Sequence, residues 1–459
     1  MHNACLKQVS NQFISTKHMN IVKLWAGVYL LLLSATGLFA QQKIDTYIDH
    51  LSQHRKFMGS VSILFKDSII YSKSVGYADV ARRQENDATT KFRVASISKT
   101  FTAVLVLQAI EAGKLGLKDK LSQYFPEIKN ADKITIEQLL QHRSGLFNFT
   151  DNPDRNDWES RFHTEKESIA HIVKAPSRFE PGTDFEYSNS NYLLLGYILE
   201  RIYRKPFAAI LQEKIVDVVG LKHTYFTNET DPGLSEALSY NIQSNYVHNQ
   251  HINFSNHLSS GGIASTAIEI NKFLSALFGG RLISKESLAL MLPEDKGAYG
   301  MGMFKLTFSK PEGFEHSGRA GNYISAYWYF PAENLGIVSL ANAINIDIEA
   351  INTALLQFAY GNTPELPDFN QISGHPGLAF REMMGTYKAK GAKQIATISS
   401  DGNMLVLQLS GAGQDYLSFE DKGNNCFEYK DIKLQFLPGK KQMLFEQGKA
   451  RLLFKKQAG

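Results

Sequence analysis

Ser96 and Lys99 stand three residues apart in the stretch FRVASISKTFTA, residues 92–103, just before a long apolar run. In a helix that begins at Ser96, Lys99 lies one turn further along the same face, within reach of the hydroxyl. A serine becomes a nucleophile when a base removes its proton, and an amine is such a base when burial lowers its pKa. The pair is therefore a candidate nucleophile and base. The alternative is that Ser96 is an ordinary N-cap and Lys99 a solvated charge.

A phenol and a carboxamide follow downstream, in FEYSNSNY at residues 185–192. Tyr187 and Asn189 are two residues apart, just before a predicted helix over residues 192–203. A tyrosine near a lysine can relay protons, and an asparagine can hold a substrate amide through its donor and its acceptor. The alternative for Tyr187 is a half-buried packing residue. The same pattern at Tyr360-Gly361-Asn362 falls at a predicted helix end and is discounted.

The third group of residues is EHSGRAG, residues 315–321, immediately before a predicted strand over residues 322–330. Gly318 and Gly321 let a substrate approach the backbone of an edge strand, and the amide of Arg319 is a candidate oxyanion donor. His316 is a candidate proton donor, or a cation at mildly acidic pH. A structural histidine is the alternative.

The surrounding elements predict an α+β fold, in which an antiparallel sheet is flanked by helices and carries a mainly helical subdomain. Residues 57–76 have two β-rich runs around Lys66-Asp67, which predict a hairpin. Residues 97–111 are apolar on nearly every side, which predicts a buried helix. Residues 134–220 are mainly helical in pattern, and residues 324–342 return to strand, turn and strand.

A proline-rich segment without periodicity divides the chain, NTPELPDFNQISGHPG at residues 362–377. We therefore expect a catalytic domain over residues 41–361, a linker over 362–378 and a C-terminal domain over 379–459. The last segment alternates short β runs with turn residues, at a spacing that predicts a small antiparallel barrel-like domain of about eight strands.

The first forty residues predict export. Residues 19–40, MNIVKLWAGVYLLLLSATGLFA, have a lysine, an apolar core and small residues before Gln41, as in a signal peptide that starts at Met19. The competing interpretation is an uncleaved membrane anchor. The mature protein would be periplasmic or extracellular, and would contact a membrane only through a retained leader. No long basic run points to nucleic acid. Of the two cysteines only Cys426 would remain after cleavage, which excludes an internal disulfide framework.

The three motifs together, in this order, resemble the serine β-lactamase and penicillin-binding-protein superfamily, specifically its class C branch, with Ser-x-x-Lys, Tyr-x-Asn and Lys/His-x-Gly. The stretches LLQHRSGL (139–146), FEPGTDFEYSNSNYLLLG (179–196) and SSGGIASTAIEINKF (259–273) support the resemblance, which spans about residues 45–360. The C-terminal segment resembles the lipocalin-like domains that follow this catalytic domain in some members.

The resemblance implies an acyl-enzyme on Ser96, proton transfer shared by Lys99 and Tyr187, and substrate orientation by Asn189. It implies an oxyanion hole from the amides of Ser96 and Arg319, with Ser317, Gly318 and Arg319 as substrate-binding residues. His316 stands where many members have lysine, a charge that attracts a substrate carboxylate. This departure favours a peptidase, amidase or esterase over an antibiotic-degrading enzyme.

The expected substrates are amides or esters, small molecules or peptides, with cell-wall material and D-amino-acid peptides as candidates. A penicillin-binding or sensor protein that is acylated without turnover is the main alternative, and a scaffold for an active C-terminal module is a weaker one. No cofactor is expected. His248, His251 and His257 invite a metal hypothesis, but no carboxylate or cysteine spacing accompanies them, so we predict a solvated loop and no metal. The sequence leaves the oligomeric state open.

Overall fold

The chain is described by a computed structural model over residues 42–151, 158–242, 245–249, 251–295, 298–307, 310–369, 382–390, 395–401, 404–409, 417–429, 432–448 and 450–457. The predicted leader, residues 1–40, and residues 370–378 of the predicted linker lie outside these ranges. Among the described residues, no helix has the length and apolar character needed to cross a membrane.

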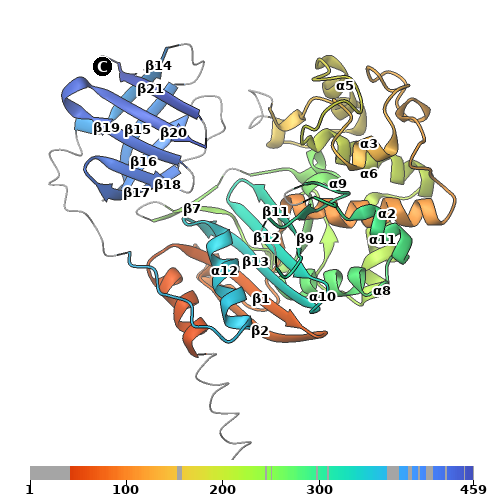
Figure 1. Ribbon diagram of the computed structural model, residues 1–459, viewed down its shortest axis with the longest axis horizontal. Coiled ribbons are helices and arrows are strands. Elements are labelled where there is room, and N and C mark those ends of the chain that lie inside the picture. The colour runs from red at the N-terminus through yellow and green to blue at the C-terminus, as the bar shows by residue number, and fades with distance from the viewer. Residues whose placement is uncertain are drawn as a thin grey trace, which may run out of the picture.

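A six-stranded antiparallel sheet forms the centre of the N-terminal part, in the order β10-β11-β12-β13-β1-β2 (Figure 1). Its strands are β1 (Phe57–Phe65), β2 (Ser68–Val75), β10 (Phe304–Lys305), β11 (Phe314–Ala320), β12 (Tyr323–Phe330) and β13 (Leu335–Ile344). The predicted hairpin is confirmed, because β1 and β2 pair around Lys66 and Asp67, both with positive φ. The sheet thus combines the first and the last strands of this part of the chain.

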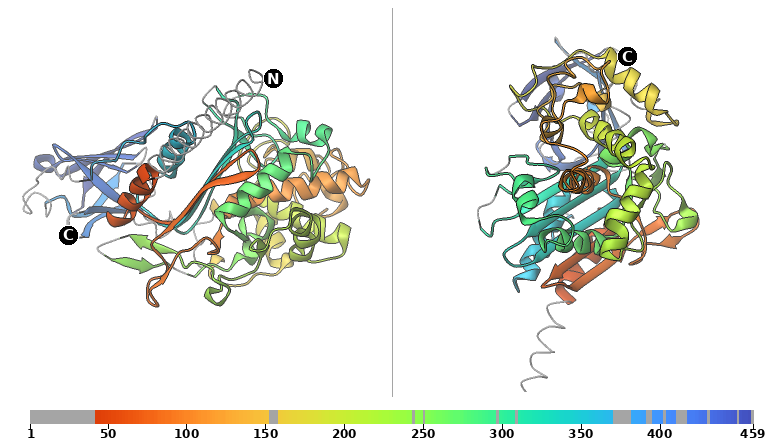
Figure 2. Two further views of the ribbon diagram at one scale, coloured as in Figure 1. Left: turned by 90° about the horizontal axis from the view of Figure 1, so that it is seen from below. Right: turned by 90° about the vertical axis from the view of Figure 1, so that its right-hand side faces the viewer.

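Helices cover both faces of the sheet. On one face, the helix over residues 42–53 and α12 (Ile348–Ala359) share an apolar cluster with β1 and β13. On the other face, α10 (Ala267–Phe278) and α2 (Ser98–Glu111) belong to a larger cluster. The left view of Figure 2 shows helix 42–53 (red) and α12 (blue-green) on the opposite side of the sheet from the green and orange helices. α12 ends at Ala359, so Tyr360 is its C-cap.

The segment between β2 and β10 supplies the helical subdomain. Its helices are α3 (Ile136–Leu140), α5 (Glu165–Lys174), α6 (Asn189–Tyr203), α7 (Phe207–Leu211), α8 (Asp217–Val219), α9 (Leu258–Gly261) and α11 (Lys285–Met291). Its short strands are β3 (Tyr77–Asp79), β4 (Gln84–Glu85), β5 (Phe92–Arg93), β6 (Tyr225–Phe226), β7 (Tyr240–Ile242), β8 (Tyr246–His248) and β9 (Ile263–Ser265). The helix predicted to start at residue 192 begins three residues earlier, at Asn189.

α2 is the buried helix that the sequence predicts. Eleven of its fourteen residues are buried, and its apolar side chains point in all directions rather than to one face. A helix of this kind must be surrounded, and α6, α9, α10 and α11 pack near it in the larger apolar cluster. The start of α2 is consequently held in the interior, between the sheet and the helical subdomain.

A buried ion pair near the start of α2 connects several segments of the helical subdomain. The Arg93 guanidinium lies 2.9 Å from the Glu236 carboxylate, and both side chains are at most 1% exposed. Arg93 also donates to the carbonyls of Thr227 and Gly262. Removing either charge would leave the other buried without its partner, which is costly in a protein interior.

The C-terminal part is an antiparallel barrel, in which the eight strands that the described residues form close through pairing of β14 with β21. These strands are β14 (Gly385–Ala389), β15 (Ile395–Asp401), β16 (Met404–Leu409), β17 (Leu417–Gly423), β18 (Cys426–Tyr429), β19 (Ile432–Leu437), β20 (Gln442–Gln447) and β21 (Ala450–Lys456). Aromatic and aliphatic side chains form one buried cluster inside, including Tyr387, Phe419, Phe427, Phe436 and Phe445. The described side chains of this cluster therefore form a core inside the barrel.

Candidate active site

Ser96 lies in a 3-10 turn, Ala95–Ile97, directly before α2 rather than within the helix. The preceding residue, Ala95, has φ 46°, a left-handed conformation that is strained for a residue with a Cβ atom. The N-cap of α2 is Ile97, and no side chain caps the helix start. The N-cap interpretation of Ser96 is therefore wrong. The Ser96 side chain is partly exposed, so a substrate can approach its hydroxyl.

Lys99 is fully buried and points its amine at three oxygen atoms. Its Nζ lies 3.0 Å from Ser96 Oγ, 2.7 Å from Asn189 Oδ1 and 2.6 Å from the Ser260 carbonyl oxygen. A solvated lysine, the alternative interpretation, is excluded by this burial. The amine instead connects the turn before α2 with the start of α6 and with α9.

Burial lowers the pKa of Lys99 well below its usual value, because the charged form is desolvated. A neutral amine has two N–H donors and one lone pair. The Asn189 and Ser260 oxygens act only as acceptors, so they use both donors. The lone pair then faces the remaining neighbour, the Ser96 hydroxyl, which can donate to it. This is the arrangement of a general base poised on a serine.

Tyr187 is half-buried in the segment that leads into α6. Burial raises the pKa of its phenol, and a hydrogen bond with Ser96 partly offsets this rise. The Lys99 amine lies 4.9 Å from the centre of the tyrosine ring. Tyr187 is consequently a neutral phenol beside the Ser96 hydroxyl, in a position to exchange a proton with groups bound there.

The Asn189 carboxamide makes all its contacts within the protein. Its Oδ1 accepts from Lys99, and its Nδ2 donates to Asn148 Oδ1 and to Thr150 Oγ1, each at 3.1 Å. Both N–H groups are therefore occupied, whereas the sequence predicts that this side chain holds a substrate amide. Asn189 therefore contacts Lys99, and its predicted role in holding a substrate stays a prediction.

The motif His316-Ser317-Gly318 lies within β11, and the strand predicted over residues 322–330 follows it as β12. A Cβ atom on Gly318 would lie 2.5 Å from the Val94 carbonyl oxygen and 2.7 Å from the Ser96 amide nitrogen. Only glycine permits such an approach, because backbone atoms cannot give way. β11 thus runs directly alongside the backbone of Ser96, with the side chains of Ser317 and Arg319 exposed.

His316 is a neutral residue at this site. Burial, followed by the nearby Lys99, lowers the pKa of His316 to about 3. Its Nδ1–H donates to the Ser317 carbonyl at 2.6 Å, so the proton-free nitrogen is Nε2, which has no partner among the described residues. The expectation that His316 becomes a cation at mildly acidic pH is therefore wrong, because its side chain is 2% exposed.

Four residues around this site were not identified from the sequence. The Ser260 carbonyl falls in the quoted stretch SSGG, and His142 in LLQHRSGL, but neither had a role that its residue type would reveal. His142 accepts at Nδ1 from the Ser188 backbone amide and packs 4.3 Å from the ring of Tyr187. Asn148 and Thr150 lie two and four residues after LLQHRSGL. A backbone carbonyl leaves no signal in a sequence, and short polar residues in loops are common.

The three loop histidines do not converge. His257 Nε2 lies 2.9 Å from a Glu159 carboxylate oxygen in a buried pair. His251 approaches Glu229 at 3.8 Å. The ring of His248 packs against another side chain, 5.7 Å from Tyr240. Among the described residues, no group of three or more histidine, cysteine or acidic side chains could hold a metal ion. The expectation of a wholly solvated loop is wrong for His257.

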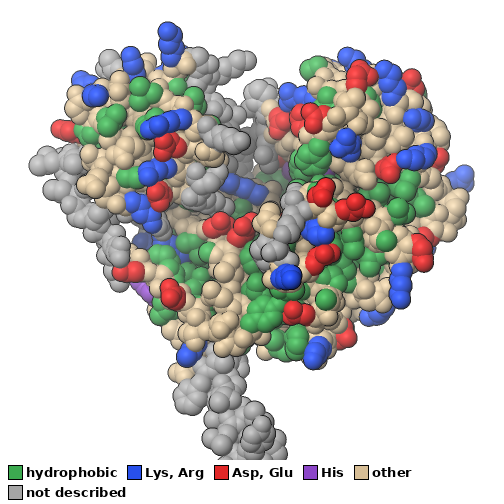
Figure 3. Space-filling model, viewed as in Figure 1, with side chains coloured by type: hydrophobic (Ala, Val, Ile, Leu, Met, Phe, Trp, Pro, Cys, Tyr) green, Lys and Arg blue, Asp and Glu red, His purple; other side chains and the backbone are tan. Residues whose placement is uncertain are grey.

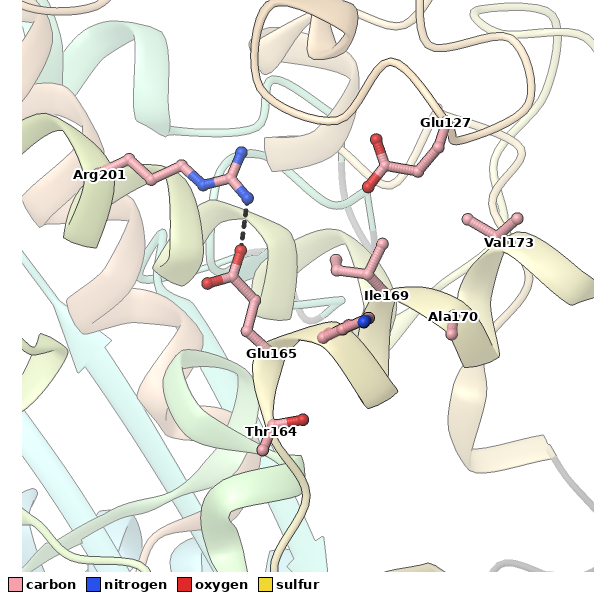
Figure 4. A pocket seen from close by; sticks show the side chains of 8 residues that line it. Glu127, Thr164, Glu165, Ile169, Ala170, Val173 and Arg201 are labelled. Atoms are coloured by element: carbon pink, nitrogen blue, oxygen red, sulfur yellow. Dashed lines mark hydrogen bonds and ion pairs between the residues drawn. The ribbon is translucent and has the colours of Figure 1, made fainter.

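A separate open pocket of about 640 Å³ lies between α5 and the far end of α6 (Figure 4). It is lined by Glu127, Thr164, Glu165, Lys166, Ile169, Ala170, Val173 and Arg201. Arg201 pairs with Glu165 at 2.6 Å. Arg201 follows Asn189 by twelve helical residues, which places the two about 18 Å apart along α6. The pocket is therefore not part of the Ser96 site.

Comparison with known proteins agrees with this geometry. The protein-family model described as Beta-lactamase matches residues 44–353. PbpX of Bacillus subtilis (strain 168) is 30% identical over 267 residues, which are 57% of this chain and 65% of that protein. Protein flp of Staphylococcus aureus (strain MRSA252) is 27% identical over 345 residues, 69% of this chain and 66% of that protein. The chain thus spans slightly less than two thirds of the length of these relatives.

Two solved structures have a similar fold. A D-amino acid amidase from Ochrobactrum anthropi SV3 superposes with a TM-score of 0.62 at 25% identity, covering 71% of this chain and 97% of that one. An octameric penicillin-binding protein homologue from Pyrococcus abyssi has a TM-score of 0.61 at 21% identity, covering 90% of this chain and 99% of that one. The second likeness concerns the fold alone.

Proposed function

The chain belongs to the Beta-lactamase family, and on that premise we propose that it is an exported serine hydrolase of the class C-related branch, acting on amides or esters through an acyl-enzyme. One observation carries the proposal: Nζ of the buried Lys99 lies 3.0 Å from Ser96 Oγ, and its two other neighbours, the Asn189 and Ser260 oxygens, are both acceptors. The similarity to a D-amino acid amidase supports amides as substrates. The predicted leader supports export.

In the proposed first step, Ser96 Oγ attacks the substrate carbonyl carbon and its proton passes to Lys99. The oxyanion that forms accepts hydrogen bonds from the amides of Ser96 and Arg319, since β11 lies against the Ser96 backbone. The bond to the leaving group then breaks. The leaving atom takes a proton from the Tyr187 phenol, which recovers one from Lys99. The product is an ester on Ser96.

In the second step, a water molecule attacks the ester carbon while the Tyr187 and Lys99 pair accepts one of its protons. The ester bond breaks, Ser96 recovers its hydroxyl proton and an acid is released. Both steps require a neutral amine at the start. The lowered pKa of Lys99 makes this form more abundant than in an ordinary lysine.

The charge of the site favours substrates without a carboxylate beside the scissile bond. His316 is neutral, since burial lowers its pKa to about 3. Ser317, Gly318 and Arg319 form the strand edge against which we propose the substrate binds. Arg319 is exposed, and its Nε donates to the Gly321 carbonyl at 3.4 Å. Neutral amides and esters, including D-aminoacyl amides, are therefore the proposed class, ahead of β-lactams.

The C-terminal domain is proposed to be an accessory of the lipocalin-like type, with a cluster of buried aromatic and aliphatic side chains inside it. We expect the chain without residues 379–459 to retain turnover. A truncated protein that folds but has lost turnover would show that the barrel takes part in catalysis.

The test is hydrolysis of chromogenic esters, D-aminoacyl amides and a cephalosporin, with mass analysis of the trapped enzyme. We expect turnover of neutral substrates that is lost in Ser96→Ala and Lys99→Met, and an acyl adduct on Ser96. A stoichiometric, permanent adduct would instead indicate the penicillin-binding or sensor function. Turnover that persists in folded Ser96→Ala would refute the proposal.

A further inference from the structure

The Asn189 carboxamide is oriented by two side chains from the loop after α3. Asn148 Oδ1 accepts from the Asn189 backbone amide at 2.9 Å and from its Nδ2 at 3.1 Å. Thr150 Oγ1 accepts the other Nδ2 hydrogen at 3.1 Å. With both hydrogens of Nδ2 bound on this side, Oδ1 must face the opposite way, toward Lys99.

Asn148 is itself oriented by charged neighbours. Its Nδ2 donates to Asp151 Oδ1 at 2.9 Å, and Asp151 lies 3.4 Å from the Arg178 guanidinium. A guanidinium only donates and a carboxylate only accepts. The amide of Asn148 must therefore turn its nitrogen to Asp151 and its oxygen to Asn189. A continuous chain of hydrogen bonds and one ion pair, each with a fixed donor and acceptor, thus connects Arg178 to Lys99.

We propose that Asn148 and Thr150 are positioning residues of this hydrolase, which keep Asn189 Oδ1 on Lys99 and so reserve the amine lone pair for Ser96. This inference rests on the proposed function, in which Lys99 is the base. In a reversed carboxamide, Nδ2–H would face Lys99. The lone pair would then accept that hydrogen instead of the serine proton, and the hydroxyl would lose its base.

The pH profile of the reaction reports this arrangement. The titratable side chains around Lys99 are Tyr187, Tyr192, His142 and His316. Burial keeps the pKa of both tyrosines high and of both histidines low, so all four are neutral near pH 7. The acidic limb of kcat/KM for an uncharged ester therefore reports the protonation of Lys99.

The experiment compares Thr150→Val, Thr150→Ser and Asn148→Ala, with Thr183→Val as the matched control. The Thr183 hydroxyl bonds the Glu180 carbonyl on the exposed surface, outside this network. Active enzyme is titrated with an acylating probe, and kcat/KM is measured from pH 5 to pH 10.

We expect Thr150→Val to lower kcat/KM about tenfold, the effect of one lost neutral hydrogen bond, and Asn148→Ala to lower it further. In both variants the acidic limb of the pH profile should move to lower pH. Asn189 Oδ1 stabilises the ammonium form of Lys99, so the pKa of Lys99 should fall when this oxygen no longer faces the amine. Thr150→Ser keeps the hydroxyl that accepts from Asn189 Nδ2, so kcat/KM and the acidic limb of its pH profile should not change. Thr183→Val should be unchanged.

Two results would overturn the inference. In the first, the unaltered protein turns over substrate normally, and Thr150→Val and Asn148→Ala have the same kcat/KM per active site and the same acidic limb of the pH profile as the unaltered protein. That result leaves the proposed function intact. The other is an unaltered protein without Ser96-dependent turnover, which refutes the proposed function and this role together.

Discussion

Replacing His316 by lysine tests the proposed link between site charge and substrate class. At pH 7 the neutral imidazole offers no charge to a substrate carboxylate, because burial and the nearby Lys99 lower its pKa from 6.5 to about 3. Lysine at the same position would introduce a cation beside Ser317, next to the proposed substrate strand. We therefore expect His316→Lys to favour substrates that carry a carboxylate.

The size of the effect follows from the surroundings of His316. The same burial and the same neighbour should lower the pKa of a lysine at this position below its usual value. A hydrogen bond to a charged group contributes about 1.5–3 kcal/mol. The ratio of penicillin acylation to neutral ester hydrolysis should rise about ten- to hundredfold.

The assay measures both reactions on the same preparation between pH 6 and pH 9, with His316→Gln as the uncharged control. Lys99 must be neutral for either substrate, so its titration cancels in the ratio. The ratio for His316→Lys should be highest at pH 6 and fall with rising pH as the introduced amine loses its proton. An active, folded His316→Lys protein with the ratio of His316→Gln at every pH would refute the charge argument.

Three further outcomes are expected. kcat/KM for a neutral ester should fall as pH drops through the lowered pKa of Lys99, and Lys99→Arg, which stays charged, should be inactive throughout the profile. Urea unfolding should show that Arg93→Met lowers the free energy of unfolding by about 3–5 kcal/mol, because Glu236 is left buried and unpaired. The control Arg82→Met removes the exposed partner of another ion pair and should change the free energy of unfolding by under about 1 kcal/mol. Gly318→Ala should lower kcat for ester hydrolysis about 10²–10³-fold, since its Cβ would lie 2.7 Å from the Ser96 amide; Gly439→Ala, with no atom within 4 Å of the added Cβ, should not change it.

On the face seen in Figure 3, acidic and basic side chains are interspersed over the helical subdomain. A large field of one sign would be needed to attract a polyanion over a distance.

The local pattern of residue types was sufficient to predict several elements of the fold. The hairpin around Lys66 and Asp67 and the buried character of α2 are visible in residue types alone, because turn chemistry and the spacing of apolar residues act over a few positions. The barrel was predicted in the same way, from short β runs between turns. The three motifs likewise named Ser96, Lys99 and Tyr187, which the structure brings together.

The chemistry of these residues was decided by tertiary structure. Lys99 is 90 positions from Asn189 and 161 from Ser260 in the sequence, yet their oxygens occupy its two donors. Its lowered pKa comes from burial among several elements, which no window of neighbouring residues records. The same burial keeps His316 neutral at mildly acidic pH, where the sequence suggested a cation. The sequence by itself determined which groups are present and in what order. Only the fold decided which of them carry a proton and which way each carboxamide faces, since desolvation and hydrogen bonding depend on segments that are distant along the chain.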